Sequence, residues 1–334
     1  MNSTSQSVSF TGRSRPRLAY FPVSFFGMVM GLFGTTIAWQ KAEALFPELS
    51  LGQFNVSDGL AIIARLLFAL TLLAYGYKWM FHADLARKEA QHPIMLNFVP
   101  TVSISLLLLA ACGHSIAPEP TRIIWMAGAA LQLALTLYVL NNWIQRQDIE
   151  LVHMSPAWFI PIVGNLIVPV AGVPFRFIEI SWLFFAIGLM FWIVLFAIVL
   201  YRIIFHHPLP EKLLPTLAIL IAPPAVAMLD WVLLNGGTLD SVARVLYYLG
   251  LFIGLVLITQ AKRLTKIPFS LSWWAWSFPI AALTIATLTM ANHIPNGFFM
   301  NLSLVLLALL SLIVLGLLKR TFSAARQGAI CQPE

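Results

Sequence analysis

Long apolar segments separated by short polar loops are the feature that most constrains this chain. Ten such segments recur along its 334 residues, and most are long enough to cross a hydrocarbon core ~30 Å thick as a helix of ~20 residues. Only 10% of the residues are charged, whereas soluble domains average ~25%. The chain lacks the polar surface needed to face water on all sides, so we predict an all-α integral membrane protein.

Windows of about 20 residues define the predicted spans, of which the fifth is short and interrupted by proline. Their limits are 22–39, 58–80, 94–113, 122–144, 157–172, 178–201, 213–234, 242–262, 273–291 and 298–320. Residues 1–20 and 321–334 are predicted to be short polar tails flanking a transmembrane domain, 21–320. The first apolar block is too long for a signal peptide and lacks a small-residue cleavage site, so we expect it to be retained.

The distribution of positive charge predicts the orientation. Fifteen of the 20 lysines and arginines fall in loops on the side of the two termini, four fall on the other side, and Arg65 lies within a span. Short cytoplasmic loops keep lysine and arginine, so both termini are expected in the cytoplasm, which requires an even number of spans. This bias accounts for most of the net charge of +7, and no nucleic-acid partner is needed to explain it.

Proline is confined to alternate spans. The odd-numbered spans contain or begin with proline, and the even-numbered spans contain none. Because proline removes a backbone donor and kinks a helix, the freed carbonyls in a membrane must be satisfied by protein or by a water-filled cavity. We therefore predict five hairpins, each with one kinked inner helix and one smooth lipid-facing helix, in a quasi-five-fold arrangement around a central pore.

Small, polar and aromatic residues of the odd spans are the candidates to line or kink such a pore. They include Gly27, Gly31, Asn97, Phe98, Pro100, Asn165, Pro223, Pro224 and Pro279. Phe278 stands out because it lies ten residues after Pro268, roughly 15 Å deep at ~1.5 Å per residue and so about halfway across the core. A bulky ring at that depth, just before the kink at Pro279, is a candidate gate.

The predicted interior lacks the groups that chemistry or ion coupling requires. All seven histidines fall at span ends or in loops, and no HExxH, GxSxG or GxxxxGK[ST] pattern occurs, so we expect neither an enzyme nor a metal site or cofactor. The carboxylates are predicted in loops or near span ends, with Asp230 near the outer end of the seventh span. A pathway without a mid-membrane acid favours passive conduction over proton-coupled transport.

Several motifs resemble the TehA and plant slow-anion-channel family (tellurite-resistance/dicarboxylate transporter family). The strongest is Trp273-Trp274-Ala275-Trp276-Ser277-Phe278-Pro279, which is similar to the family's ninth helix. Further matches occur in order in the other odd spans. They are Phe26-Gly27 to Trp39, His92-Pro93 with Asn97-Phe98, Val163-Gly164-Asn165, and Ile221-Ala222-Pro223-Pro224-Ala225-Val226-Ala227.

The resemblance implies ten helices in five hairpins, a pore through each protomer and assembly as homotrimers. It also implies that the pore is closed by a phenylalanine of the ninth helix, here Phe278, with Phe98 of the third helix as a second candidate. Relatives are linked to chloride, nitrate, malate, sulfite and tellurite. Unlike the plant channels, this chain has short tails, so regulation by kinases is not carried over.

Three hypotheses follow. The first is a passive, phenylalanine-gated anion channel for small inorganic or organic anions, in the lipid bilayer of a bacterial inner membrane. The second is a proton-coupled carrier or exporter of dicarboxylate, sulfite or tellurite-type oxyanions, which would saturate and respond to a proton gradient. The third is a membrane enzyme or sensor, for which the sequence shows no set of catalytic residues.

Overall fold

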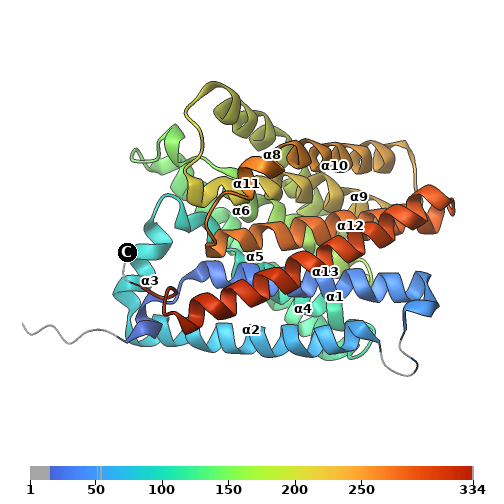
Figure 1. The fold of residues 1–334 in the computed structure, drawn as a ribbon, viewed down its shortest axis with the longest axis horizontal. Coiled ribbons are helices and arrows are strands. Elements are labelled where there is room, and N and C mark those ends of the chain that lie inside the picture. The colour runs from blue at the N-terminus through green and yellow to red at the C-terminus, as the bar shows by residue number, and fades with distance from the viewer. Residues whose placement is uncertain (1–15, 51, 53–54, 333–334) are drawn as a thin grey trace, which may run out of the picture.

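The computed structural model describes residues 16–50, 52 and 55–332, and within these residues the regular structure is helical, without a strand. Most of the predicted N-terminal tail, 1–20, and the last two residues of the predicted C-terminal tail lie outside this part of the chain. The long helices lie side by side along the longest dimension of the molecule (Figure 1). Nine of the described helices are long and apolar enough to cross a membrane, which agrees with an integral membrane protein.

Five helical stretches, called the inner helices, combine 3₁₀ and α geometry, and each opens with a 3₁₀ segment. In chain order they are η2 (Val23–Phe25) with α1 (Phe26–Leu45), η4 (Met95–Phe98) with α4 (Thr101–Gly113), η6 (Pro156–Trp158) with α6 (Phe159–Val163), η7 (Gly164–Leu166) and α7 (Ile167–Gly172), η8 (Glu211–Ile221) with α9 (Ala222–Leu234), and η9 (Leu271–Trp276) with α12 (Ser277–His293). A change from 3₁₀ to α geometry within one span is typical of a strained or functional segment.

Five outer helices alternate with the inner ones along the chain and are α-helical throughout. They are α2 (Val56–Phe81), α5 (Pro118–Gln145), α8 (Ile178–Phe205), α10 (Ser241–Thr259) and α13 (Gly297–Arg326). In the apolar stretches of the four long inner helices, 72–78% of the residues are buried, against 28–33% in the outer helices. The prediction that the proline-bearing helices are interior is therefore confirmed, and the outer helices present Leu, Ile, Val and Phe to lipid.

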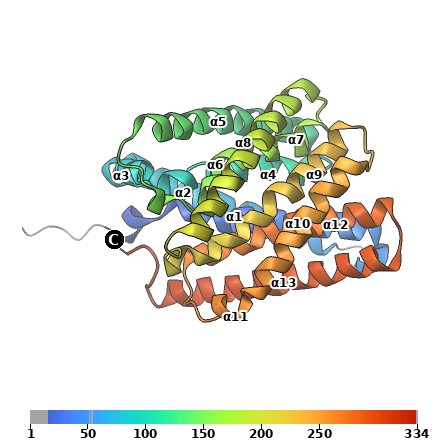
Figure 2. The same ribbon diagram turned by 90° about the horizontal axis from the view of Figure 1, so that it is seen from above.

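The inner helices form a closed ring. α1 contacts α4, α4 contacts α7, α7 contacts α9, α9 contacts α12, and α12 contacts α1. Each inner helix also packs against the outer helix that follows it in the chain, which gives the five predicted hairpins. Seen from above, α1 lies between α5 and α13, which occupy opposite flanks (Figure 2).

Short helices connect these elements. They are η1 (Arg17–Tyr20), η3 (Pro47–Leu49), α3 (Ala83–Gln91), η5 (Leu151–His153) and α11 (Ala261–Leu264). Pro16 and Gln332, the two ends of the described chain, lie at one end of the bundle, where a Cβ on Gly328 would come within 3.0 Å of the Arg17 guanidinium. We call this the termini side and the opposite end the far side.

The fifth span, Pro156–Gly172, is broken by η7 and is shorter than a full spanning helix, as its interruption by proline predicted. Two details differ from the sequence prediction. α5 begins at Pro118 and includes Pro120, so an outer helix does carry proline, in its first turn, where no backbone donor is lost. The last helix continues past residue 320 to Arg326, into the predicted tail.

Candidate functional site

A cavity of about 1170 Å³ occupies the termini side of the ring and receives side chains from all five inner helices. Along each inner helix the lining residues stop near the point where α geometry takes over. The last lining residues of the five inner helices are, in chain order, Met30, Ile104, Ile167, Ala222 and Pro279. The cavity therefore extends from the termini side into the middle of the ring and ends there.

Phe278 lies at the closed end of this cavity, in the first turn of α12. A Cβ on Gly34 would lie 3.2 Å from Cδ2 of Phe278, so the ring packs against the glycine backbone of α1. Phe98, the last residue of η4, also lines the cavity and is half-buried like Phe278. The structure thus brings the two candidate gate residues into one cavity, together with Gly27 and Pro279.

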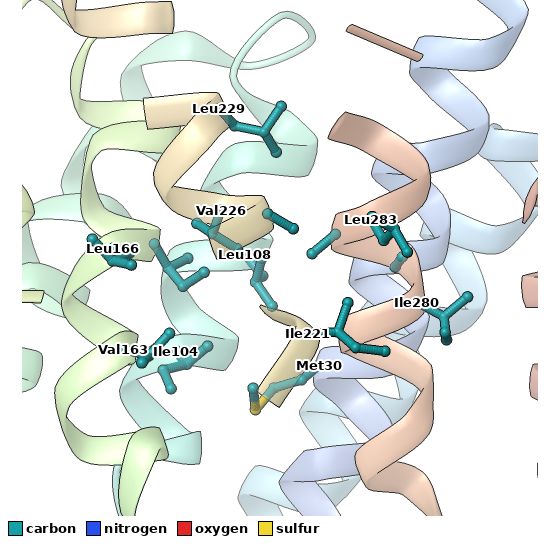
Figure 3. Packing of buried hydrophobic residues seen from close by; sticks show 14 of the residues in the cluster. Met30, Ile104, Leu108, Val163, Leu166, Ile221, Val226, Leu229, Ile280 and Leu283 are labelled. Atoms are coloured by element: carbon teal, nitrogen blue, oxygen red, sulfur yellow. The ribbon is translucent and has the colours of Figure 1, made fainter. Parts of the chain in front are cut away.

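Beyond Phe278 the ring is filled by apolar side chains. Figure 3 shows side chains from several inner helices in the space between the ribbons, among them Leu108 of α4 and Val226 of α9. Both residues are buried, with 2% of their surface exposed. This packing closes the cavity toward the far side.

The mouth of the cavity is rich in basic groups. Lys88 and Lys212 are exposed at its rim, and Lys78 lies beneath them. Lys78 is almost completely buried because its ammonium pairs with Glu89 at 2.8 Å and donates to the carbonyl of Phe21 at 3.0 Å. One carboxylate thus neutralises the buried ammonium, and the two exposed rim lysines give the mouth a positive potential.

Glu89 also positions the start of the first inner helix. Its other carboxylate oxygen accepts a hydrogen bond from the backbone N–H of Val23 at 2.9 Å. The Lys78–Glu89 pair therefore joins α2, α3 and the first turn of η2. The sequence analysis missed this contact at the cavity mouth, because Glu89 lies between two predicted spans and belongs to no motif.

Two of the predicted pore-lining residues, both polar, do not line the cavity but donate hydrogen bonds to backbone carbonyls. Asn165 is fully buried, and its amide donates to the carbonyls of Pro161 and Ile162 at 3.3 and 2.9 Å. The Pro161 carbonyl also accepts from Gln132 and Thr136 of α5. Asn97 likewise donates to carbonyls at the start of η4, those of Pro93 and Ile94. These bonds satisfy the carbonyls that broken helical geometry exposes, as the membrane interior requires.

The remaining predicted residues lie in the contacts between helices. A Cβ on Gly31 would lie 2.5 Å from Cβ of Ser277, so this glycine lets α1 and α12 approach closely. Pro100 immediately precedes α4, and its carbonyl accepts from Ser103. Pro223 and Pro224 occupy the first turn of α9 and are buried. None of these residues is among those that line the cavity.

Asp230 is the acidic residue whose surroundings the sequence analysis did not anticipate. It lies in α9, and none of its surface is exposed. Neither carboxylate oxygen has a hydrogen-bond partner among the described residues. The sequence placed it near the outer end of the seventh span, and the structure shows that it is completely buried there. Across the described chain no three His, Cys, Asp or Glu side chains gather as a metal site.

A ring of kinked helices around a half-open cavity with a basic mouth is the architecture of a polytopic membrane protein with a central pathway. Comparison with known proteins agrees with this class. A family model described as voltage-dependent anion channel (SLAC1) matches residues 20–322, and the chain belongs to this family.

Individual relatives come from plants, bacteria and archaea. The chain is 29% identical over 309 residues to the S-type anion channel SLAH2 of Arabidopsis thaliana, which covers 92% of this chain and 59% of that protein. It is 26% identical over 264 residues to a tellurite resistance protein TehA homolog of Haemophilus influenzae, with 78% and 79% covered. An uncharacterized transporter of Methanocaldococcus jannaschii, MJ0576, is 28% identical over 288 residues, with 78% and 81% covered. The chain thus spans little more than half of the plant channel it matches.

Proposed function

We propose that this protein is a passive anion channel in which a pore runs between the five inner helices of each protomer and Phe278 closes it. The observation that carries the proposal is the cavity itself. It is lined by every inner helix, its mouth carries Lys88 and Lys212, and its lining on α12 ends at Phe278 and Pro279. A cavity enclosed by all five inner helices, with an aromatic ring at its closed end, supports a pore that this ring closes.

Charge and helix orientation both favour anions. The inner helices begin on the termini side, at residues such as Val23, Met95 and Leu271. The N-terminal end of a helix carries a partial positive charge, so several such ends around the cavity favour an anion there. Small monovalent anions such as chloride or nitrate fit a pathway this narrow and apolar. The name of the plant relative, an S-type anion channel, supports the same class of ion.

The membrane setting is part of the proposal. Because the loops on the termini side hold most of the lysines and arginines, that side faces the cytoplasm, and the cavity is a cytoplasmic vestibule. A bacterial inner membrane and a homotrimer with one pore in each protomer follow from the resemblance to TehA-like proteins. Crosslinking of the protein in native membranes would test the trimer.

Ion currents across a planar bilayer test the channel directly. With chloride at different concentrations on the two sides and equal pH, the reversal potential should follow the chloride gradient, and no proton gradient should be needed. A carrier would instead move labelled malate, sulfite or tellurite with saturation and with dependence on a proton gradient, while carrying no unitary current. That result would reject the channel in favour of the coupled carrier.

A further inference from the structure

The buried carboxyl group of Asp230 has no role in the pathway described so far. Every residue of α9 from Ala222 to Asp230 is buried, and both oxygens of the Asp230 carboxyl lack a donor among the described residues. A carboxylate inside a membrane protein is costly unless it is paired, and such residues are kept where an ion or a proton must bind. Asp230 therefore requires an explanation.

Helix geometry shows where this carboxyl points. Gly250 of the outer helix α10 faces Pro224 and Ala225, each about 3.6 Å from its Cβ position. Asp230 follows the midpoint of that pair by about 5.5 residues. At ~100° per residue this is a rotation of roughly 550°, which leaves roughly 190° after one complete turn. Asp230 thus points away from α10, toward the inside of the ring. Val226, one turn earlier on nearly the same face, lies on the inner side in Figure 3.

Among the described residues, no charged side chain pairs with the carboxyl. η7 and α7 carry no titratable side chain, and Lys212 and Arg202 belong to the opposite ends of η8 and α8. Tyr247 of α10 is bonded to Thr287, and Asp240 to the indole N–H of Trp231. The remaining titratable side chains of the helices around the far end of α9 are exposed: Glu179, Arg244, Tyr248 and His293. Protonation is therefore the simplest way to neutralise the buried carboxyl group of Asp230.

We propose that Asp230 is a proton-binding site in the far half of the anion pathway, and that anions pass when it is protonated and are repelled when it is ionised. The proposal rests on the channel function proposed above and adds a ligand, the proton, at a second point beyond Phe278. A negative charge facing a narrow apolar passage raises the energy of an anion there, because the local dielectric constant is low. Since Asp230 lies four residues from the far end of α9, protons reach it from the far side.

The test uses full-length protein in planar bilayers with Phe278→Ala as background, so that the aromatic gate does not mask the effect. Acidifying the far-side bath from pH 8 to pH 5 should raise the anion current roughly tenfold, whereas acidifying the termini side should change it little. Adding Asp230→Asn should give the high current at both pH values. Asp230→Glu should retain a pH response, and Glu179→Gln, which changes an exposed acid on the same side, should leave it intact.

The outcomes separate the two proposals. An anion current that ignores far-side pH in the Phe278→Ala background, or a pH response that persists with Asp230→Asn, overturns the role of Asp230 and leaves the channel standing. The far-side pH titration of Phe278→Ala keeps the wild-type Asp230, so its result does not depend on whether the Asp230 variants fold. Absence of anion current at every pH rejects the channel and the proton site with it.

Discussion

Replacing Gly31 with alanine tests the closest contact between the inner helices. The new Cβ would lie 2.0 Å from Oγ and 2.5 Å from Cβ of Ser277. Rotation of the serine hydroxyl relieves the first clash, but the second involves a Cβ that moves only with the backbone. Because Cβ atoms do not approach other atoms within 3.0 Å, α1 and α12 must separate by about 0.5 Å.

The expected cost follows from this displacement. Inserting a methyl group into a packed contact costs about 1–3 kcal/mol, and the better helix propensity of alanine returns up to about 1 kcal/mol. A net loss of about 1–2 kcal/mol should lower the apparent Tm by about 2–6 °C. Ser277→Gly removes both clashing atoms, so the double variant should recover much of the loss.

Thermal unfolding in detergent, followed by loss of the monodisperse peak, measures the effect. Gly316→Ala on the lipid-facing helix α13 is the matched control, because nothing lies within 4 Å of its Cβ position. It should be as stable as the wild-type protein or slightly more so. If Gly31→Ala also matches the wild type, Gly31 faces open space and the close packing of α1 on α12 is refuted.

Two further predictions concern the mouth of the cavity. Lys78→Met should destabilise the protein by about 3–5 kcal/mol in unfolding assays, because it leaves the Glu89 carboxylate buried and unpaired. The control Arg122→Gln breaks an exposed ion pair and should cost less than about 1 kcal/mol. Equal losses of stability in the two variants would argue against the buried pair. Burial raises the pKa of the Cys331 thiol, so less of the reactive thiolate is present at a given pH, and its labelling by a charged thiol reagent should still accelerate at a pH where the rate for free cysteine in solution has levelled off. A rate that levels off at the same pH as that of free cysteine would contradict this.

The layout of the fold could be predicted from the sequence because one rule links proline to burial. A proline within a membrane helix exposes carbonyls that lipid cannot satisfy, so helices with Pro100, Pro223 or Pro279 must be interior. The structure confirms this assignment through the contrast in burial between inner and outer helices. The short fifth span was also predictable, because the prolines within Pro156–Gly172 interrupt it.

The positions of single side chains around the axis were harder to predict. Sequence shows that Asn165 is on an inner helix, but not that its amide turns toward the carbonyls of Pro161 and Ile162. Likewise Gly31 and Gly27 lie one turn apart on α1, yet only Gly27 lines the cavity. Such differences depend on how each helix is rotated against its neighbours, which is set by packing across the ring. The burial of Asp230 was missed for the same reason.

The conductance of Phe278→Ala is the measurement that tests the central claim most directly. The ring lies at the closed end of the cavity, so its removal should raise the anion current across a voltage-clamped bilayer several-fold or more over a small wild-type current. Phe191→Ala removes the same ring from the lipid-facing surface of α8 and should leave the current unchanged. If Phe278→Ala conducts no better than the wild-type protein or the Phe191→Ala control, the claim that Phe278 closes an anion pathway between the five inner helices is wrong.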